Sequence, residues 1–320
     1  MGEYLTVNEK ISYAKVAEEN GLASAWIAEH YYYRDAVVTA AAILSHTKKL
    51  IVGTSIINPF TRHPALLAMT SATLSEMSGG RFILGLGLGI PLWIEQQMGI
   101  DMGSQIVSLR ESVQLIKSLL SGESFADGKR FVARNVKLGF GTDDHRTPVY
   151  IAGVKSRMLE LAAAYGDGVI LPAGSSPDYV RKAIPIINGS LKKSKKANTE
   201  IVCLAYLLVD QDSRLAKTKV KPWLFPILMR PDREELILAD KPEEKTRVKQ
   251  AKKYMITGDR EKAESLVDDG ILEAISISGN SDECLRAIRE FAKAGVTHLV
   301  LNPTESKPAT LEKFYAKLNL

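Results

Sequence analysis

The feature that most constrains the fold is a recurring order of amphipathic helix, glycine and short apolar strand. In residues 8–20 apolar side chains recur at helical spacing, Gly21 follows, and residues 23–28 are almost wholly apolar. A similar order returns around residues 35–54, 64–86, 156–171 and 284–301. Glycine after a helix is the usual left-handed cap of its C-terminus. Short apolar strands that alternate with helices indicate a parallel sheet covered by helices.

The strands expected from this pattern are residues 24–28, 50–54, 81–86, 148–152, 168–171, 201–208 and 297–301. Seven such strands in 320 residues favour an α/β fold of the TIM (β/α)8-barrel type over a doubly wound sheet, which usually needs fewer residues. The chain opens almost directly into a helix. The first barrel strand is therefore expected to be missing or reduced to Glu3–Val7.

We expect a single barrel domain over residues 1–320 with two insertions. Residues 122–147 are expected to form a hairpin-like excursion with turns at Gly128 and Gly139. Residues 210–270 are expected to form a charged helical insertion before the last strand.

Several classes of protein are excluded by what the sequence lacks. The apolar runs are shorter than the roughly 20 residues that a membrane helix needs, and the first residues lack the basic and apolar regions of a secretory signal. The two cysteines, Cys203 and Cys284, supply neither a CxxC pair nor a disulfide framework. A cytoplasmic protein without a membrane partner is expected.

Charge is distributed unevenly along the chain. Residues 181–260 carry 19 basic and 10 acidic side chains, whereas the rest of the chain carries 23 basic and 27 acidic ones. A solvated helical face and an anionic ligand both account for this excess of positive charge. No zinc-finger spacing or aromatic RNA-binding signature is present, so nucleic acid is not expected as a partner.

Candidate catalytic residues lie just after the expected strands, because barrel enzymes place their active sites at the C-terminal ends of the strands. Glu29 and His30 follow strand 24–28. An imidazole at this position can donate or accept a proton near neutral pH, and Glu29 can orient it or bind a polar ligand edge. The pattern alone leaves a structural role for His30 open. No metal site is expected, because no HxH or HExxH spacing occurs.

Three glycines, Gly85, Gly87 and Gly89, accompany the third expected strand. They do not form a dinucleotide-binding GxGxxG, because Ile90 and Leu92 stand where a further glycine is required. Glycine at a strand end allows a flat ring to approach the backbone, and close packing of a strand against a helix explains it equally well. GxSxG and GxxxxGK[ST] motifs are absent, which excludes acyl transfer and nucleotide hydrolysis.

The chain resembles the luciferase-like family of flavin- and deazaflavin-dependent oxidoreductases. Within that family it is most similar to the methylenetetrahydromethanopterin reductases, which use coenzyme F420. The likeness covers nearly the whole chain outside residues 210–270. The segments that carry it are Glu29-His30, NPFTRHP at 58–64, LSEMSGGRFILGLG at 74–87, PVYIAG at 148–153, AYGDGVI at 164–170 and GVTHLVL at 295–301.

The resemblance implies a luciferase-like barrel that binds the ring of coenzyme F420 (an 8-hydroxy-5-deazaflavin), or alternatively FMN, at the C-terminal ends of the strands. It places His30 beside the ring and Glu29 where deazaflavin users often have Asp. Ile90 stands where several relatives carry an acidic proton donor, which argues against a glucose-6-phosphate dehydrogenase-like reaction. The matched cofactor positions are Ile56, Ile57 and Asn58 behind the ring, Gly87, Leu88 and Gly89 beside its reactive centre, and Ala152, Gly153 and Lys155 at the phosphate-bearing tail.

The leading interpretation is an oxidoreductase that transfers a hydride between coenzyme F420 and a small polar or pterin-like substrate. The basic residues 181–260 suit the anionic tail of F420. One alternative is an FMN-dependent luciferase-like monooxygenase, and another is a non-catalytic cofactor-binding or partner protein of the same fold. The resemblance also implies a homodimer through the outer helices of residues 35–78, where small side chains allow close approach at Ala40, Ala41, Ala42, Ala65, Ala68 and Ala72.

Overall fold

The computed structural model describes residues 4–125, 128–142, 146–231, 233–234, 238, 240–304 and 306–318. The chain divides into two compact units. The first unit contains the residues up to Ile170 together with Ile187–Glu200. The second unit contains Leu171–Ile186 and the residues from Ile201 on. The expectation of a single barrel domain over residues 1–320 stays a prediction.

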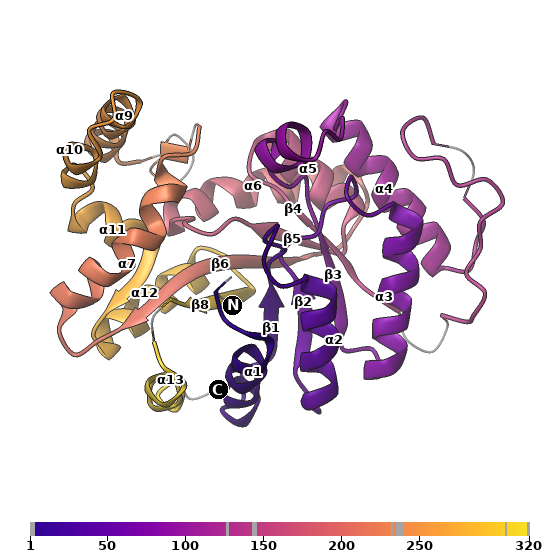
Figure 1. The fold of residues 1–320 in the computed structure, drawn as a ribbon, viewed down its shortest axis with the longest axis horizontal. Coiled ribbons are helices and arrows are strands. Elements are labelled where there is room, and N and C mark those ends of the chain that lie inside the picture. The colour runs from indigo at the N-terminus through magenta and orange to yellow at the C-terminus, as the bar shows by residue number, and fades with distance from the viewer. Residues whose placement is uncertain are drawn as a thin grey trace. The chain divides into compact units, whose positions relative to one another are not determined.

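A parallel sheet forms the centre of the first unit (Figure 1). Its strands pair in chain order, and most of their side chains are buried, which is typical of a parallel sheet with both faces covered. Since the strands are parallel, their C-terminal ends share one edge of the sheet. The strands are β1 (Ser24–Ile27), β2 (Ile51–Thr54), β3 (Phe82–Leu86), β4 (Val149–Ala152) and β5 (Gly168–Leu171).

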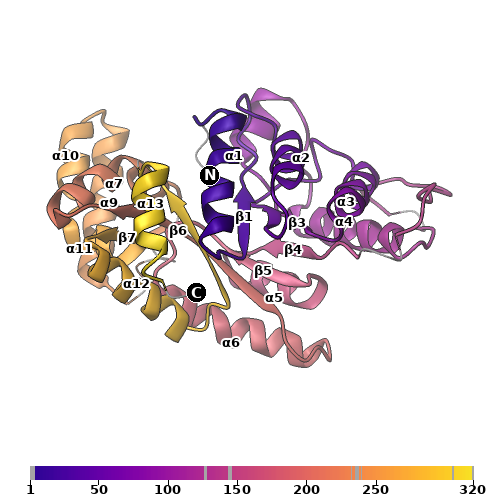
Figure 2. The same cartoon turned by 90° about the horizontal axis from the view of Figure 1, so that it is seen from below.

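Helices connect these strands, and their ends follow from capping residues. Asp35 begins one helix by accepting the backbone N–H of Val38 at 2.9 Å. Gly79 ends the next helix in the left-handed conformation, with φ of 67°, as the sequence predicts. Helices α3 and α4 lie side by side in both ribbon views (Figures 1 and 2). The helices are α1 (Val7–Glu19), α2 (Ala36–His46), α3 (Pro64–Ser78), α4 (Gln105–Leu120) and α5 (Ser156–Tyr165).

A carboxylate on α1 fastens the turn that joins α2 to β2. Glu18 accepts the backbone N–H groups of Lys48, Lys49 and Leu50 at 2.8, 2.6 and 2.9 Å. Burial raises the pKa of Glu18, but these three hydrogen bonds and the charge of Arg81 outweigh it and hold the pKa below its usual 4.5. Glu18 is therefore ionised when it fastens this turn near neutral pH.

The second unit is built around β6 (Glu200–Val209). This strand pairs in parallel with both β7 (Ser276–Gly279) and β8 (His298–Pro303). Helix α6 (Pro177–Lys193) has residues in both units. The other helices are α7 (Ser213–Leu228), α9 (Pro242–Ile256), α10 (Arg260–Ser265), α11 (Asp269–Ile275), α12 (Ser281–Lys293) and α13 (Pro308–Tyr315).

Helices α7, α9 and α10 fall within the segment 210–270, which the sequence predicts to be a helical insertion. They share a buried apolar core with the end of β6 and with α11. The fully buried members of this core include Leu208, Ala216, Val220, Leu224, Leu228, Val248, Ala251, Ala263, Ile271, Leu272 and Ile275. The segment is therefore charged on its surface and apolar inside.

Each of the seven expected strands is present to within two residues at either end. Strand β7 is not predicted, because its Ser-Ile-Ser-Gly stretch lacks the apolar run of the other strands. In the expected stub Glu3–Val7, residues 4–7 form a turn and the start of α1 rather than a strand, and Glu3 lies outside the described residues. No strand precedes β1 among the described residues, in agreement with a missing first barrel strand.

The expected hairpin-like excursion takes another form. The described residues of 122–147 form turns and bends and contain no strand. A hairpin needs two paired runs of extended residues, and here glycine and charged residues interrupt the extended runs.

None of the helices in the described ranges is both long enough and apolar enough to cross a lipid bilayer.

Candidate active site

The candidate residues of the first unit lie where its strands end. Glu29 and His30 follow β1, residues 56–58 follow β2, residues 87–89 follow β3, and residues 152–155 end and follow β4. Because these strands pair in order and run parallel, the four segments meet at one edge of the sheet.

Beyond the regular strands, the segment after β2 stays paired with the end of β3, but one residue of that segment is left without a partner in β3. The N–H of Ile57 donates to the carbonyl of Gly85 at 3.0 Å, and the N–H of Gly87 donates to the carbonyl of Ile57 at 3.0 Å. The intervening Ile56 follows a cis peptide bond from Ser55. The chain therefore bulges at Ile56, next to the residues that the resemblance places behind the ring.

Three of the expected cofactor residues come together around Gly87. A Cβ atom on Gly87 would lie 2.8 Å from Cγ1 of Ile56 and 3.3 Å from Cβ of Ala152, so these residues from three strands converge. Gly89 has φ of 74°, and a Cβ there would lie 2.6 Å from Ile94. The left-handed conformation at Gly89 therefore requires glycine, whereas at the buried Gly87 an added Cβ would displace the side chain of Ile56.

Gly85 has a different role from the two glycines that follow it. The hydroxyl of Thr54 donates to the carbonyl of Gly85 at 3.0 Å and accepts its N–H at 2.9 Å. A Cβ on Gly85 would overlap the backbone carbonyl oxygen of Thr54. Close packing explains Gly85, whereas Gly87 and Gly89 border the candidate site.

His30 lies among aromatic side chains and is half-buried. Its ring centre is 6.4 Å from that of Trp93 and 6.5 Å from that of Tyr33. Trp93 belongs to a π-helix, η1 (Leu92–Gln97), and also meets the ring of Tyr31 edge-on at 5.5 Å. The neighbouring Ile94 approaches Gly89, so η1 links His30 to the glycine segment.

A single arginine holds the loop that carries His30. The guanidinium of Arg62 binds the carboxylate of Glu29 through one nitrogen and that of Asp35 through another. The side chain of Glu29 is only 10% exposed. Asp35 is also the N-cap of α2. Glu29 is thus tied to the segment after β2, and its position fixes the start of the His30 loop.

Asn58 connects the same two segments through neutral hydrogen bonds. It is buried, and its side-chain amide donates to the hydroxyls of Tyr31 and Thr61, while its carbonyl oxygen accepts the N–H groups of Phe60 and Thr61. Burial raises the pKa of Tyr31; the hydrogen bond with Thr61 opposes this, and the charge of Glu29 adds to the rise. Tyr31 therefore stays protonated near neutral pH.

The segment after β4 leads directly into α5. The N–H of Gly153 donates to the carbonyl of Ile170 at 3.1 Å, and a Cβ on Gly153 would lie 3.0 Å from the backbone of Met158 and Leu159. Lys155 is the exposed N-cap residue of α5. A helix N-terminus carries partial positive charge and attracts anionic groups.

The structure brings most of the predicted site residues together, and it adds three that sequence reasoning missed. Arg62 lies inside the segment 58–64 and Tyr31 directly follows His30, but no pattern indicated the partners of either. Trp93 had no signal, because its position depends on η1. Leu88 lies between the two glycines and is half-buried. The roles assigned to Glu29, His30 and the cofactor residues stay predictions.

Comparison with known proteins identifies the family. Residues 2–298 match the family described as luciferase-like monooxygenase. The chain belongs to this family. The luciferase-like protein is 31% identical over 310 residues to the 5,10-methylenetetrahydromethanopterin reductase of Methanolobus tindarius, covering 93% of this chain and 92% of that one. It is also 31% identical over 293 residues to the enzyme of the same name from Archaeoglobus fulgidus, covering 90% and 87%.

A solved structure agrees with these relatives. The coenzyme F420-dependent tetrahydromethanopterin reductase from Methanopyrus kandleri superposes with a TM-score of 0.82 at 27% identity, covering 98% of the luciferase-like chain and 94% of that structure. The predicted family and the predicted luciferase-like α/β barrel fold are confirmed.

Proposed function

We propose that this luciferase-like protein is an oxidoreductase that transfers a hydride between coenzyme F420 and a pterin-like substrate, as a methylenetetrahydromethanopterin reductase. The observation that carries the proposal is the convergence of Ile56, Gly87 and Ala152 at the strand ends. Ile56 supplies an apolar surface for a flat ring, and glycine at position 87 lets the side chain of Ile56 lie against the strand end. The identity of 31% with two reductases of that name supports the choice of reaction.

The residues around this surface have distinct tasks in the proposed reaction. Reduced F420, when bound, supplies a hydride to the substrate. The ring nitrogens of His30 can give or take the accompanying proton near neutral pH. Arg62 holds Glu29 and Asp35, and so positions the loop that carries His30. Trp93 and Tyr33 flank the His30 ring and limit its orientation.

The cofactor's anionic tail is proposed to lie at the start of α5. Ala152 borders Gly87, and Gly153 is packed against the first turn of the helix. The side chain of Lys155 adds a positive charge beside the partial charge of the helix N-terminus. A phosphate there would be held by backbone N–H groups and by an ammonium group.

Titration of the purified protein with F420 and with FMN tests the cofactor, and mixing reduced F420 with methylenetetrahydromethanopterin tests the reaction. We expect saturable F420 binding and substrate-dependent oxidation of the reduced cofactor. Tight binding of FMN without binding of F420 would contradict the proposal and favour an FMN-dependent monooxygenase. Binding of F420 without turnover would favour a non-catalytic cofactor-binding protein.

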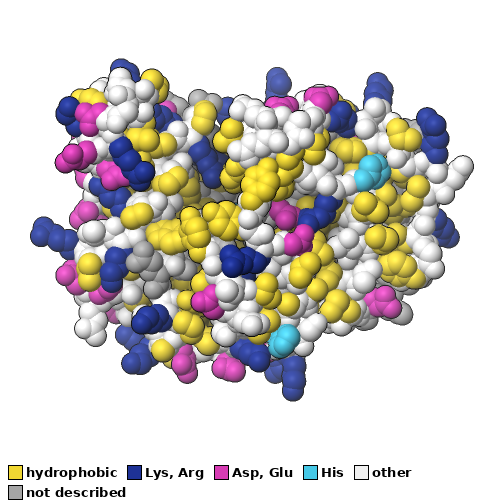
Figure 3. All heavy atoms as spheres, viewed as in Figure 1, with side chains coloured by type: hydrophobic (Ala, Val, Ile, Leu, Met, Phe, Trp, Pro, Cys, Tyr) yellow, Lys and Arg dark blue, Asp and Glu magenta, His cyan; other side chains and the backbone are white. Residues whose placement is uncertain are grey.

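A homodimer through the outer helices of residues 35–78 is a further proposal. Hydrophobic side chains gather on the surface over α2 and α3 (Figure 3), and Val38, Leu66, Met69 and Met77 are exposed there. Light scattering should give twice the monomer mass, and L66D together with M69D should give the monomer. The same change at the exposed Met255 should leave the dimer intact, and a monomeric parent protein would refute the proposal.

The cytoplasmic location also stays a proposal. Cys203 and Cys284 are both free and buried, as suits a reducing compartment. Cell fractionation tests the location.

A further inference from the structure

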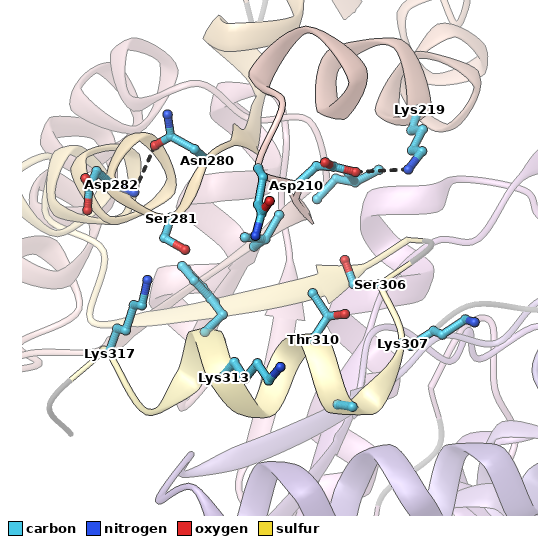
Figure 4. A pocket seen from close by; sticks show the side chains of 15 residues that line it. Asp210, Lys219, Asn280, Ser281, Asp282, Ser306, Lys307, Thr310, Lys313 and Lys317 are labelled. Carbon is cyan, nitrogen blue, oxygen red and sulfur yellow. Dashed lines mark hydrogen bonds and ion pairs between the residues drawn. The ribbon is translucent and has the colours of Figure 1, made fainter.

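The second unit contains a pocket of about 790 Å³ at the C-terminal ends of β6, β7 and β8. This volume lies in the range of small-molecule sites. Asp210 and Lys219 lie at one side, Asn280 and Ser281 at the start of α12, and the remaining wall is α13 with Lys307 at its start (Figure 4). Every lining residue belongs to the second unit, and none is among the residues of the candidate active site.

The lining carries an excess of positive charge. Lys307, Lys313 and Lys317 line the α13 side, and within the described residues no ion pair or side-chain hydrogen bond engages their ammonium groups. Lys219 differs, because its ammonium group is paired with Asp210 at 3.0 Å. One further acidic residue, Asp282, lines the pocket. The unpaired charges therefore leave the pocket net positive.

The start of α12 adds little to this potential and offers few free donors. The side chain of Asn280 accepts the N–H groups of Asp282 and Glu283, each at 3.1 Å, and Glu283 in return accepts the N–H of Asn280 at 2.8 Å. The carboxylates of Asp282 and Glu283 offset the partial positive charge of this helix end. The direct contacts to an anion would thus come from the lysines and from the hydroxyls of Ser281 and Thr310.

We propose that this pocket binds a small polyanion that carries two or more phosphate or carboxylate groups. Lys307 precedes α13, Lys313 lies within it and Lys317 follows its end at Tyr315, so the three cations are spread along the length of the helix. Cations spread over that length match separate anionic groups better than a single one. The proposal goes beyond the proposed oxidoreductase function and does not depend on it.

Isothermal titration of the purified protein with pyrophosphate, citrate and orthophosphate tests the proposal. We expect pyrophosphate or citrate to bind saturably at one site, and orthophosphate to bind about tenfold more weakly or less well. Preference for pyrophosphate identifies a phosphate ligand, and preference for citrate a polycarboxylate; either supports the site. Absence of saturable binding by both overturns it.

Variants show whether the binding occurs in this pocket. K313Q with K317Q should weaken binding by about tenfold or more, because each removes a charged hydrogen-bond donor. The matched double variant K192Q with K193Q removes the same charge from an exposed part of α6 and should bind like the parent. Equal weakening in this control would place the anion elsewhere and overturn the proposal. If K313Q with K317Q fails to fold, K307Q with K317Q replaces it.

Discussion

Replacing Gly87 with alanine is the sharpest test of the candidate ring site. The new Cβ would lie 2.8 and 2.9 Å from two carbons of Ile56 and 3.3 Å from Cβ of Ala152. Favourable carbon–carbon contact begins near 3.5 Å, so Ile56 has to move by roughly 0.6 Å or more. Ile56 is half-buried at the end of a strand, and its side chain can rotate away from the sheet.

The expected cost to stability is small and the expected cost to cofactor binding is larger. Overpacking costs about 1–3 kcal/mol, and the freedom of Ile56 puts Gly87→Ala near about 1 kcal/mol. In a domain of this size that loss lowers the thermal midpoint by about 2 °C. Because the displaced Ile56 would enter the surface proposed for the ring, F420 affinity should fall by about tenfold or more, which corresponds to about 1.4 kcal/mol.

Thermal unfolding and F420 titration on the same preparations separate the two effects. Gly139→Ala is the matched control, since a Cβ there meets nothing within 4 Å and should change neither quantity. Gly85→Ala is the opposite control, because its Cβ would overlap the Thr54 carbonyl oxygen inside the sheet and should lower the midpoint far more. If Gly87→Ala binds F420 like the parent, the ring does not lie against Ile56 and the proposed site is wrong.

Three further substitutions have definite outcomes. His30→Ala should cost about 1–2 kcal/mol or less in stability but lower turnover by about 10²–10⁴; a low thermal midpoint with normal turnover of the folded fraction would show that His30 is structural. Arg62→Ala leaves the nearly buried Glu29 without its partner and should lower the free energy of unfolding in urea by about 1–3 kcal/mol. The control Arg214→Ala, at an exposed position, should change it by no more than about 0.5 kcal/mol. The folded-state pKa of Glu18 is lowered, so the parent should be more stable than Glu18→Gln by the full difference above about pH 4.5. This difference should disappear as the pH falls through the lowered pKa. Thermal midpoints measured against pH check this, and a difference that grows in acid would contradict it.

The strands and helices were largely predictable, because they depend on local patterns. The spacing of apolar residues and the glycines after helices place β1 to β5 to within a residue or two, whereas α4 was not predicted. Strand β7 escaped prediction because its pairing with β6 joins residues about 70 positions apart, Tyr206 with Ser276 among them. Two serines and a glycine in four residues give it no apolar run.

The candidate site was predictable in its positions but not in its contacts. His30 and Gly87 were found because barrel strands end at the site. The pairing of Arg62 with Glu29 joins residues 33 positions apart, and no periodicity links them. The side-chain amide of Asn58 holds Tyr31 and Thr61, contacts that no sequence pattern indicates. The orientation of Trp93 follows from η1, which has no sequence pattern of its own.

The two ion pairs of Arg62, with Glu29 and with Asp35, lower the entropy cost of binding a ligand beside His30. Fixing the backbone of one residue costs about 1–2 kcal/mol in conformational entropy. The segment 29–35 is held at both of its ends by one guanidinium, and Asp35 is further held by α2. Much of that entropy is therefore lost when the chain folds rather than when a ligand arrives. His30 reaches its place during folding, so less of the binding free energy is consumed in ordering the chain around the ring.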